Sequence, residues 1–406
     1  AIVFSGGYAR ADFTFGEPVN LGTPMNSSAS DTLDFVSADG LEMYLTSDRS
    51  GGYGSWDIWV STRETIDDDW AIPENLGPTI NTNQPDFLAY MSSDNLELYF
   101  TSYNRSGGYG IDDIWVSRRT TRNDPWGTPV NLGPEVNSSS NDGTPSISPD
   151  GLELYFVRRS GGYGSDDIWV SKRATKNDPW GEAMNLGPVV NSSASEAFPF
   201  LFFDGLVLFF SEERDVTLRP GGFGNADMWF TIRASFNVPW GVPVNLGPIV
   251  NSPSLDCNPR ISPDGSTLYF TSERPGGFGG MYGDIYEASV IPIVDLNTDG
   301  IVDAADMCIV VDHWGTDDSL CDIGPMPWGD GVVDVEDLIV LADHLFEEVD
   351  DPTLIAHWPM DETEGMYAAD SIGENNAIVM GGATWQPNGG QIDGALELNG
   401  VDGCAI

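Results

Sequence analysis

The stretch GTPSISPDGLELYFVRRSGGYGSDDIWVSKR, residues 143–173, decides the fold. It holds a short inner run, a tight Asp-Gly turn, an alternating run rich in β-formers, a glycine-rich reversal and a further β-rich run. Together with WGEAMNLG at residues 180–187, these runs predict four short antiparallel strands. The stretch therefore describes one small sheet.

The same phrases return along the chain at a nearly constant period. The asparagine of the NLG phrase stands at positions 20, 75, 131, 185 and 245, a spacing of 54 to 60 residues. The glycine-rich phrase also occurs five times, at 49–59, 105–115, 159–169, 219–229 and 274–286. Four strands in each such period are typical of the blades of a β-propeller.

The ends of the repeat region predict the number of blades. The last copy ends at DIYEASV without its outermost strand, and FTFGEPVNLG at residues 13–22 supplies only that strand. We therefore expect an all-β, five-bladed β-propeller over residues 12–291, whose N-terminal strand completes the last blade; an open solenoid is the alternative. The SPDGxxLYFTSxR and GGYGxxDIW phrases resemble the TolB-type, WD-like propeller repeat, which implies a fold but not a function.

The glycine-rich phrase has a structural and a functional interpretation. Its paired glycines permit a tight reversal, and the Arg before it and the Asp after it are expected to form an ion pair across the loop. These pairs are Arg49 with Asp57, Arg105 with Asp113, Arg159 with Asp167, Arg219 with Asp227, and Arg274 with Asp284. The aromatic residue of each loop is either a platform for sugars or a lid on the neighbouring blade. The five are Tyr53, Tyr109, Tyr163, Phe223 and Phe278.

The predicted inner strands carry two kinds of polar residue. One acid recurs in every blade, and we expect it to cap backbone amides, with a cation site or glycosidase carboxylates as alternatives. These acids are Asp31, Asp86, Asp142, Glu196 and Asp256. Residues that break the repeat are better candidates for a ligand on the channel wall. They are Asp34, Tyr90, Asn258 and Arg260, with the aromatic set Phe198, Phe200, Phe202 and Phe203.

Composition excludes several classes of function. The net charge of -46, from 63 acidic and 17 basic residues, disfavours nucleic acid and anionic membranes as partners. No run of about 18 apolar residues predicts membrane insertion. All three histidines lie beyond the propeller, at 313, 344 and 357, so the repeats hold no Ser-His-Asp triad or His metal centre. No catalytic residue is predicted.

The segment DLNTDGIVDAAD, residues 295–306, matches a calcium-binding loop. The expected ligands are Asp295, Asn297, Asp299, the carbonyl of Ile301, Asp303 and Asp306. No Lys or Arg follows Arg274, although 27 Asp and Glu do, so a cation is expected to stabilise this region.

A helix is expected after this loop, and a second loop and helix repeat the pattern. Residues 292–350 thus resemble a type I dockerin, which implies calcium as cofactor and a cohesin partner; an intramolecular spacer is the alternative. Asp330, Asp334 and Asp337 form a weak second site or none, and Asp322 joins them only if the intervening segment bulges.

Two further features concern the C-terminal part. Cys308 and Cys321 form a disulfide or remain as thiols, two alternatives that the sequence leaves open. Residues 354–406 resemble the beginning of a laminin-G or concanavalin-A-like jelly roll, and an unpaired edge in so short a piece favours self-association.

These modules together predict a secreted or cell-surface, non-catalytic modular protein whose propeller binds glycan or protein. The first alternative is a carbohydrate-active enzyme of glycoside hydrolase type that uses channel carboxylates. The second is a structural subunit of an extracellular assembly.

Overall fold

The computed structural model describes residues 13–66, 68–202, 205–213, 218–233, 235–279, 283–292, 294–296, 301–316, 321–324 and 332–346, with five short strands beyond residue 366. The chain divides into two compact units. One is residues 15–290, and the other combines residues 1–14 with 291–406.

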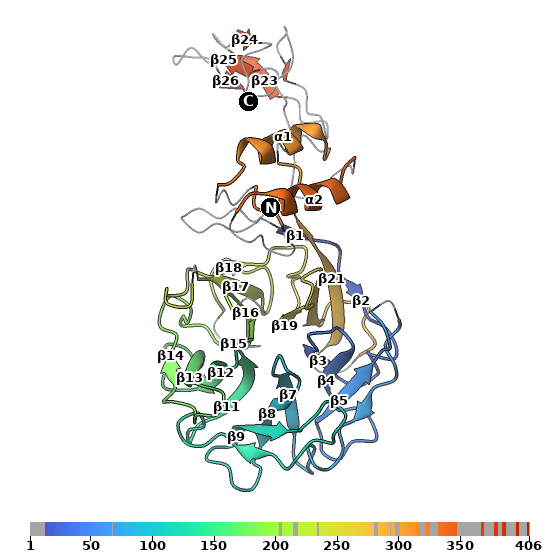
Figure 1. Cartoon of the computed structure of the whole chain (residues 1–406), viewed down its shortest axis with the longest axis vertical. Helices are drawn as coiled ribbons and strands as arrows, with labels where there is room; N and C mark the ends of the chain where they lie inside the picture. The colour runs from blue at the N-terminus through green and yellow to red at the C-terminus, as the bar shows by residue number, and fades with distance from the viewer. Residues whose placement is uncertain are drawn as a thin grey trace. The chain divides into compact units, whose positions relative to one another are not determined.

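Five antiparallel sheets stand around a common centre, with β3, β7, β11, β15 and β19 innermost (Figure 1). The first blade is β3 (Asp31–Val36), β4 (Glu42–Ser47), β5 (Asp57–Thr62) and β6 (Glu74–Asn75). The second is β7 (Asp86–Met91), β8 (Glu97–Tyr103), β9 (Asp112–Arg118) and β10 (Val130–Asn131). The third is β11 (Asp142–Ile147), β12 (Glu153–Arg159), β13 (Asp166–Lys172) and β14 (Met184–Asn185). The fourth is β15 (Glu196–Leu201), β16 (Val207–Glu212), β17 (Met228–Ile232) and β18 (Val244–Asn245).

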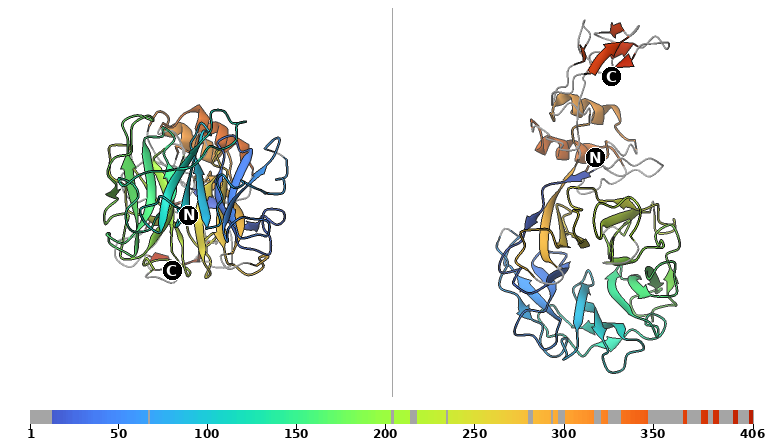
Figure 2. Two further views of the ribbon diagram at one scale, coloured as in Figure 1. Left: turned by 90° about the horizontal axis from the view of Figure 1, so that it is seen from below. Right: turned by 180° about the vertical axis from the view of Figure 1, so that it is seen from behind.

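The fifth blade is built from both ends of the repeat region, as Figure 2 shows from behind. It contains β19 (Asp256–Ile261), β20 (Thr267–Ser272) and β21 (Asp284–Pro292), joined by β1 (Phe13–Phe15) and β2 (Val19–Asn20). Val19 pairs with Glu287 and Asn20 with Tyr286, and Leu21 N donates to Ile285 O at 3.1 Å. The predicted five-bladed, closed propeller is confirmed, and the open solenoid is wrong.

In four of the five blades an arginine follows the third strand, at positions 63, 119, 173 and 233. Arg173 of the third blade lies 3.4 Å from Glu97 of the second and stacks on Trp180 at 4.3 Å. Arg233 repeats this arrangement one blade later, 2.8 Å from Glu153 and 4.6 Å from Trp240. Because each guanidinium is covered by an indole and paired with an acid of the preceding blade, it links two sheets and holds their spacing.

Each inner strand contains a bulge, and the position of this bulge in the first blade differs from its position in the other four. In four blades the third residue of the inner strand has a left-handed φ of 52–57°, at Leu88, Thr144, Phe198 and Asn258. In the first blade the register shift instead falls between Leu33 and Phe35, at Asp34. Bulges of this kind re-aim side chains, so the channel entrance is not five-fold symmetric.

The second unit contains two helices with matching caps. They are α1 (Ala304–Asp312) and α2 (Val335–Asp343), each begun by a reciprocal capping box: Asp303 with Asp306, and Asp334 with Asp337. Their shared core includes Val302, Val310, Val333, Val340 and Leu341. Cys308 is exposed and Cys321 buried, and no disulfide joins them, so the disulfide alternative is wrong.

Short strand pairs complete the description. They are β22 (Tyr367–Ala368), β23 (Ala377–Met380), β24 (Thr384–Gln386), β25 (Ala395–Glu397) and β26 (Cys404–Ala405), in the orders β22-β23-β26 and β24-β25. Most of the predicted jelly roll, residues 354–406, lies outside the described residues. In the part of the chain that the structure describes, no helix is long and apolar enough to cross a membrane.

Candidate functional site

The glycine-rich loops are held by their aspartates, but not through the arginines that the sequence suggested. Asp57 accepts from the backbone N–H of Tyr53 at 2.5 Å and of Gly54 at 2.9 Å, and from Asn75 Nδ2 at 2.8 Å. The other four blades repeat the bond from the aromatic residue's N–H at 2.5–2.6 Å. The loop aspartate therefore fixes the loop by accepting hydrogen bonds from its backbone and from the asparagine of the NLG phrase.

The arginines bind the inner-strand acids instead, so the predicted ion pair across the loop is wrong. Arg49 lies 2.5 Å from Asp31, and the equivalent pairs are Arg105 with Asp86, Arg219 with Glu196 and Arg274 with Asp256. The third blade uses Arg158, 2.5 Å from Asp142, rather than Arg159. Each inner acid also accepts a backbone N–H four residues earlier, as Asp31 does from Ser27 at 2.7 Å. Their predicted role as amide caps is confirmed.

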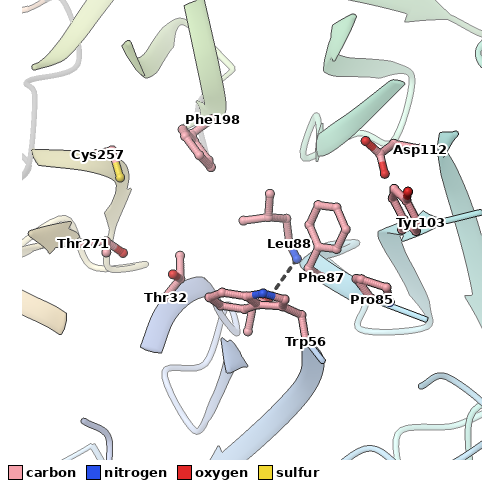
Figure 3. Close-up of a pocket in the computed structure, with 11 residues that line it drawn as sticks. Thr32, Trp56, Pro85, Phe87, Leu88, Tyr103, Asp112, Phe198, Cys257 and Thr271 are labelled. Atoms are coloured by element: carbon pink, nitrogen blue, oxygen red, sulfur yellow. Dashed lines mark hydrogen bonds between the residues drawn. The ribbon is translucent and has the colours of Figure 1, made fainter. Parts of the chain in front are cut away.

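A pocket of about 340 Å³ lies where the inner strands begin. Its walls come from the first, second, fourth and fifth blades, and Figure 3 shows the side chains converging from these sheets. The surface is mostly apolar, with a small number of polar groups, as in many ligand sites. The lining residues are Thr32, Thr46, Trp56, Pro85, Phe87, Leu88, Tyr103, Asp112, Phe198, Cys257 and Thr271.

Asp112 is the acid of this pocket. Burial raises the pKa of its carboxyl to about 6; Arg159 lowers it, and Asp113 and Asp142 add to the rise. Its Oδ1 is buried and accepts no hydrogen bond from any described residue. In Figure 3 the carboxyl lies beside Tyr103. A carboxyl that is kept partly protonated and leaves one oxygen unused is suited to exchange a proton with a ligand.

Thr271 supplies a second unused polar atom on the far wall of the pocket (Figure 3). Its counterparts accept a backbone N–H from the bulge of the next blade: Thr46 from Leu88 at 2.8 Å, and Thr101 from Thr144 at 2.9 Å. The first blade has its bulge one residue later, and Leu33 stays paired with Leu45. Thr271 Oγ1 is thus left without a partner among the described residues.

Asp34 lies behind the pocket wall. Thr46 Oγ1 is 2.9 and 2.8 Å from its two carboxyl oxygens, and Ala89 N donates to Oδ2 at 3.0 Å. Burial raises the pKa of Asp34 to about 7. The inner strands of the third, fourth and fifth blades carry a proline where the second blade has Ala89, so the second blade alone among these four offers an N–H at this position. Asp34 therefore positions Thr46 and does not line the pocket itself.

The other predicted channel residues form a buried group at the centre of the ring. Tyr90 packs against Phe35 with ring centroids 4.6 Å apart, and its hydroxyl lies 3.3 Å from Leu201 O. Arg260 Nε donates to Asp34 O at 2.6 Å, and burial lowers the pKa of Arg260 to about 10. Asn258 Nδ2 donates to Leu33 O. These residues do not line the pocket; Phe198 does, whereas Phe203 lies outside the described residues.

The five loop aromatics are about half exposed. Tyr53, Tyr109, Tyr163, Phe223 and Phe278 have exposed fractions of 49–53%. They are therefore neither buried lids nor freely solvated side chains. Tyr53 and Tyr109 precede the pocket residues Trp56 and Asp112 by three positions in the sequence.

The predicted calcium ligands are described only in part. Asn297, Asp299 and Asp330 lie outside the described residues. Asp295, Asp306, Asp322 and Asp337 are buried, and Asp306 accepts from Leu296 N at 2.7 Å and Asp303 N at 2.8 Å. Gly324 N donates to Asp337 in the same way at 2.7 Å, and Ile301 and Asp334 are on the respective loops. Within the described ranges, no three potential metal-binding side chains cluster.

The sequence did not identify Asp112, Thr271, Trp56 or Phe87. A signal for Asp112 exists: at the position before the loop aspartate, the five copies have Trp56, Asp112, Asp166, Ala226 and Gly283. Divergence at one position of a regular repeat marks a place where the blades differ in role. For Thr271 no such signal exists. Its hydroxyl lacks a partner because the bulge in the inner strand of the first blade is shifted, and the residue type of Thr271 does not show this.

The comparisons with known proteins concern the propeller. No family model and no curated protein matches the sequence. TolB from Acinetobacter baumannii is 15% identical, with a TM-score of 0.42, over 70% of this chain and 63% of that one. An endo-arabinanase from Bacillus licheniformis is 15% identical, with a TM-score of 0.43, over 65% and 96%. An α-L-arabinofuranosidase from Podospora anserina, solved with cellotriose, is 11% identical, with a TM-score of 0.43, over 70% and 98%. This chain thus spans less than two thirds of the TolB structure.

These findings correct the leading functional prediction. Several of the solved propellers to which the chain is similar are arabinanases and arabinofuranosidases. The leading prediction of a non-catalytic binding protein is therefore corrected, because propellers of this fold include enzymes; the likeness shows the fold alone, and the alternative of a carbohydrate-active enzyme is a proposal.

Proposed function

We propose that the propeller hydrolyses a glycosidic bond in the pocket at the channel entrance: Asp112 gives its proton to the leaving oxygen, water adds to the anomeric carbon, and the proton released by the water restores the acid. The observation that carries this proposal is Asp112 itself. It is the acid among the pocket-lining residues, its pKa is raised to about 6, and its buried Oδ1 has no partner among the described residues.

The chemistry of glycoside cleavage fits such a carboxyl. A general acid must still hold its proton when the leaving oxygen begins to separate, and an apolar environment secures this by raising the pKa. Trp56 and Phe87 offer apolar surface for the faces of a sugar ring, while Thr271 Oγ1 offers a hydrogen bond to a hydroxyl. Both unused polar atoms then gain partners in the bound state.

Asp34 has a supporting role in this proposal. Glycosidases commonly act through two carboxyl groups. The carboxyl of Asp34 contacts the pocket only through the hydroxyl of Thr46. We assign to it the orientation of that hydroxyl and of the Leu88–Ala89 backbone, since both are bonded to the same network.

The test is an assay of the whole chain on α-L-arabinofuranosides and linear arabinan, with xylan and β-glucans alongside. Asp112→Asn should lower kcat at least 100-fold on any substrate that is turned over. Asp166→Asn is the matched control, because Asp166 occupies the equivalent position in the third blade but binds Ser195 at 2.8 Å and does not line the pocket. Turnover that survives Asp112→Asn, or no turnover of any glycoside, overturns the proposal.

The second unit has its own proposed role. We propose a calcium-stabilised, dockerin-like module at 292–350, because residues 295–306 match a calcium-binding loop and the acids at its two ends, Asp295 and Asp306, are buried. The exposed apolar residues Val335 and Ile339 of α2, with Cys308 and Val311 of α1, are proposed as the surface for a cohesin-like partner. Calcium titration followed by calorimetry tests the first claim, and binding to a purified cohesin tests the second.

Two further assignments remain proposals. Residues 354–406 are proposed as the beginning of a laminin-G-like sandwich, and a secreted or cell-surface location is proposed from the calcium motif and the acidic composition. Self-association through the tail is tested by sedimentation at several concentrations.

A further inference from the structure

Two exposed tyrosines stand on the loops that also build the pocket. Tyr53 and Trp56 lie on the loop before β5 of the first blade, and Tyr109 lies on the loop that leads into Asp112, the first residue of β9. Trp56 and Asp112 form part of the pocket wall, whereas Tyr53 and Tyr109 are 52% and 53% exposed outside it. The remaining three loops carry equally exposed aromatics but contribute no residue to the pocket.

These tyrosines are attached to rigid backbone. Tyr53 N and Gly54 N both donate to Asp57, and Tyr109 N and Gly110 N both donate to Asp113, at 2.5–3.0 Å. The loops also lie close against the following blade: a Cβ added at Gly54 would lie 2.5 Å from Gln84 O. A half-exposed ring on fixed backbone offers a stacking surface without a large ordering cost on binding.

The charges around these loops favour a neutral polysaccharide over an anionic polymer. Arg49 and Arg105 are paired with Asp31 and Asp86, so their charges are already neutralised. Asp112 adds a negative group at the pocket, and the whole chain carries a net charge of -46. Arg159 is an exposed cation that acts on Asp112, but it is paired with Asp166. Against a net charge of -46 an anionic polymer would still meet repulsion, whereas a neutral polysaccharide would not.

We propose that Tyr53 and Tyr109 are stacking subsites for a neutral polysaccharide that crosses the pocket. This inference rests on the proposed function and deepens it: the substrate is a polymer with sugar units on both sides of the bond that is cleaved, not a short glycoside. The loops of the other three aromatic residues contribute no residue to the pocket. We therefore do not assign these residues as subsites for the polysaccharide.

Kinetics on substrates of two lengths test the proposal. Tyr53→Ala and Tyr109→Ala should each raise KM for linear arabinan about fivefold to tenfold while leaving kcat/KM on a short aryl arabinofuranoside within twofold. Phe223→Ala is the matched control, since Phe223 has the same loop position and a 49% exposed ring but no pocket neighbour. Equal effects of Phe223→Ala and Tyr53→Ala overturn the inference.

A binding assay separates this inference from the proposed function. The Asp112→Asn variant should be retained on insoluble arabinan and released when Tyr53→Ala and Tyr109→Ala are added, and it should not be retained on polygalacturonate. Retention that depends on the two tyrosines without turnover by the wild type supports the surface and refutes the enzyme. Retention that is independent of both tyrosines, or stronger on polygalacturonate, refutes the surface.

Discussion

Arg158 Nε lies 2.5 Å from Asp142 Oδ1, whereas its neighbour Arg159, which fits the repeat, is 3.6 Å from Asp166 and largely exposed. Arg158 also donates to Val136 O at 2.7 Å and stacks on Trp169 at 4.6 Å. Two adjacent arginines of the same blade thus have different physical roles. One ties the inner strand to the glycine-rich hairpin, and the other lies at the surface.

We expect Arg158→Ala to destabilise the propeller by about 3 kcal/mol, because it leaves the fully buried Asp142 carboxylate without its cation. Arg159→Ala should cost less than about 0.5 kcal/mol, as is usual for an exposed ion pair. Urea denaturation followed by tryptophan fluorescence measures both. Equal losses for the two variants would contradict the prediction, because they would show that the Arg158–Asp142 pair stabilises the propeller no more than the exposed Arg159–Asp166 pair does.

This pair shows where sequence reasoning succeeds and where it stops. The blade count, the closing strand and the capping role of Asp142 follow from repeat spacing, turn residues and acid position, which are all local properties. The choice between Arg158 and Arg159 depends on strand register, because Asp142 pairs with Arg158 across the sheet. Register of this kind is set by the bulge and the neighbouring blade, and one copy of the repeat does not contain it.

The pocket is harder to predict for the same reason. Asp112 is visible as a break in the repeat, but its raised pKa comes from burial between blades. Thr271 has the same residue type as Thr46 and Thr101 and differs only because the first blade shifts its bulge to Asp34. A difference of one residue in a strand of the first blade thus creates an unsatisfied group in a strand of the fifth blade, at the other end of the repeat region.

Asp34 should make stability depend on pH. Its pKa is about 7 in the folded chain against an ordinary value of 3.8, so the folded state binds the proton more tightly than the unfolded state does. The stabilisation is complete below pH 4 and is lost as pH rises through 7. Asp34→Asn keeps an oxygen for Ala89 N–H and should be more stable than the wild type at pH 8 by roughly a few kcal/mol.

The control for this prediction has the opposite sign. Asp39 accepts from Ser37 and Leu41 and pairs with Arg122, and its pKa is lowered to about 2. Asp39→Asn should therefore lose stability relative to the wild type as pH rises from 2 to 4, and change little above that. Melting curves of the three proteins from about pH 2 to 8 compare them; parallel curves for the wild type and Asp34→Asn would contradict the prediction.

Activity should depend on the proton of Asp112. As the proton donor, it acts in its protonated form, so kcat/KM should fall as pH rises through about 6. Arg159 lowers the pKa of Asp112, and Arg159→Ala should move this fall to higher pH. The shift should shrink in high salt, since the guanidinium is exposed. If Arg159→Ala leaves the pH profile unchanged at low salt, the group that controls kcat/KM is not Asp112.

Calcium removal should act on the second unit alone. Asp306 and Asp337 are fully buried at the starts of α1 and α2, and the chain beyond Arg274 has no basic side chain except three histidines. Without calcium, the acidic side chains of the 295–306 loop lose the cation that the motif is expected to bind, and the core around Val302, Val310 and Val333 is small. The propeller has a separate core and paired acids.

Calorimetry measures the effect. A calcium chelator should abolish the melting transition of residues 292–350 or lower its temperature, and it should leave the propeller transition in place. Excess calcium should restore the first transition. A single transition that ignores the chelator would mean that these buried acids are stabilised by hydrogen bonds such as those from Leu296 and Gly324 alone.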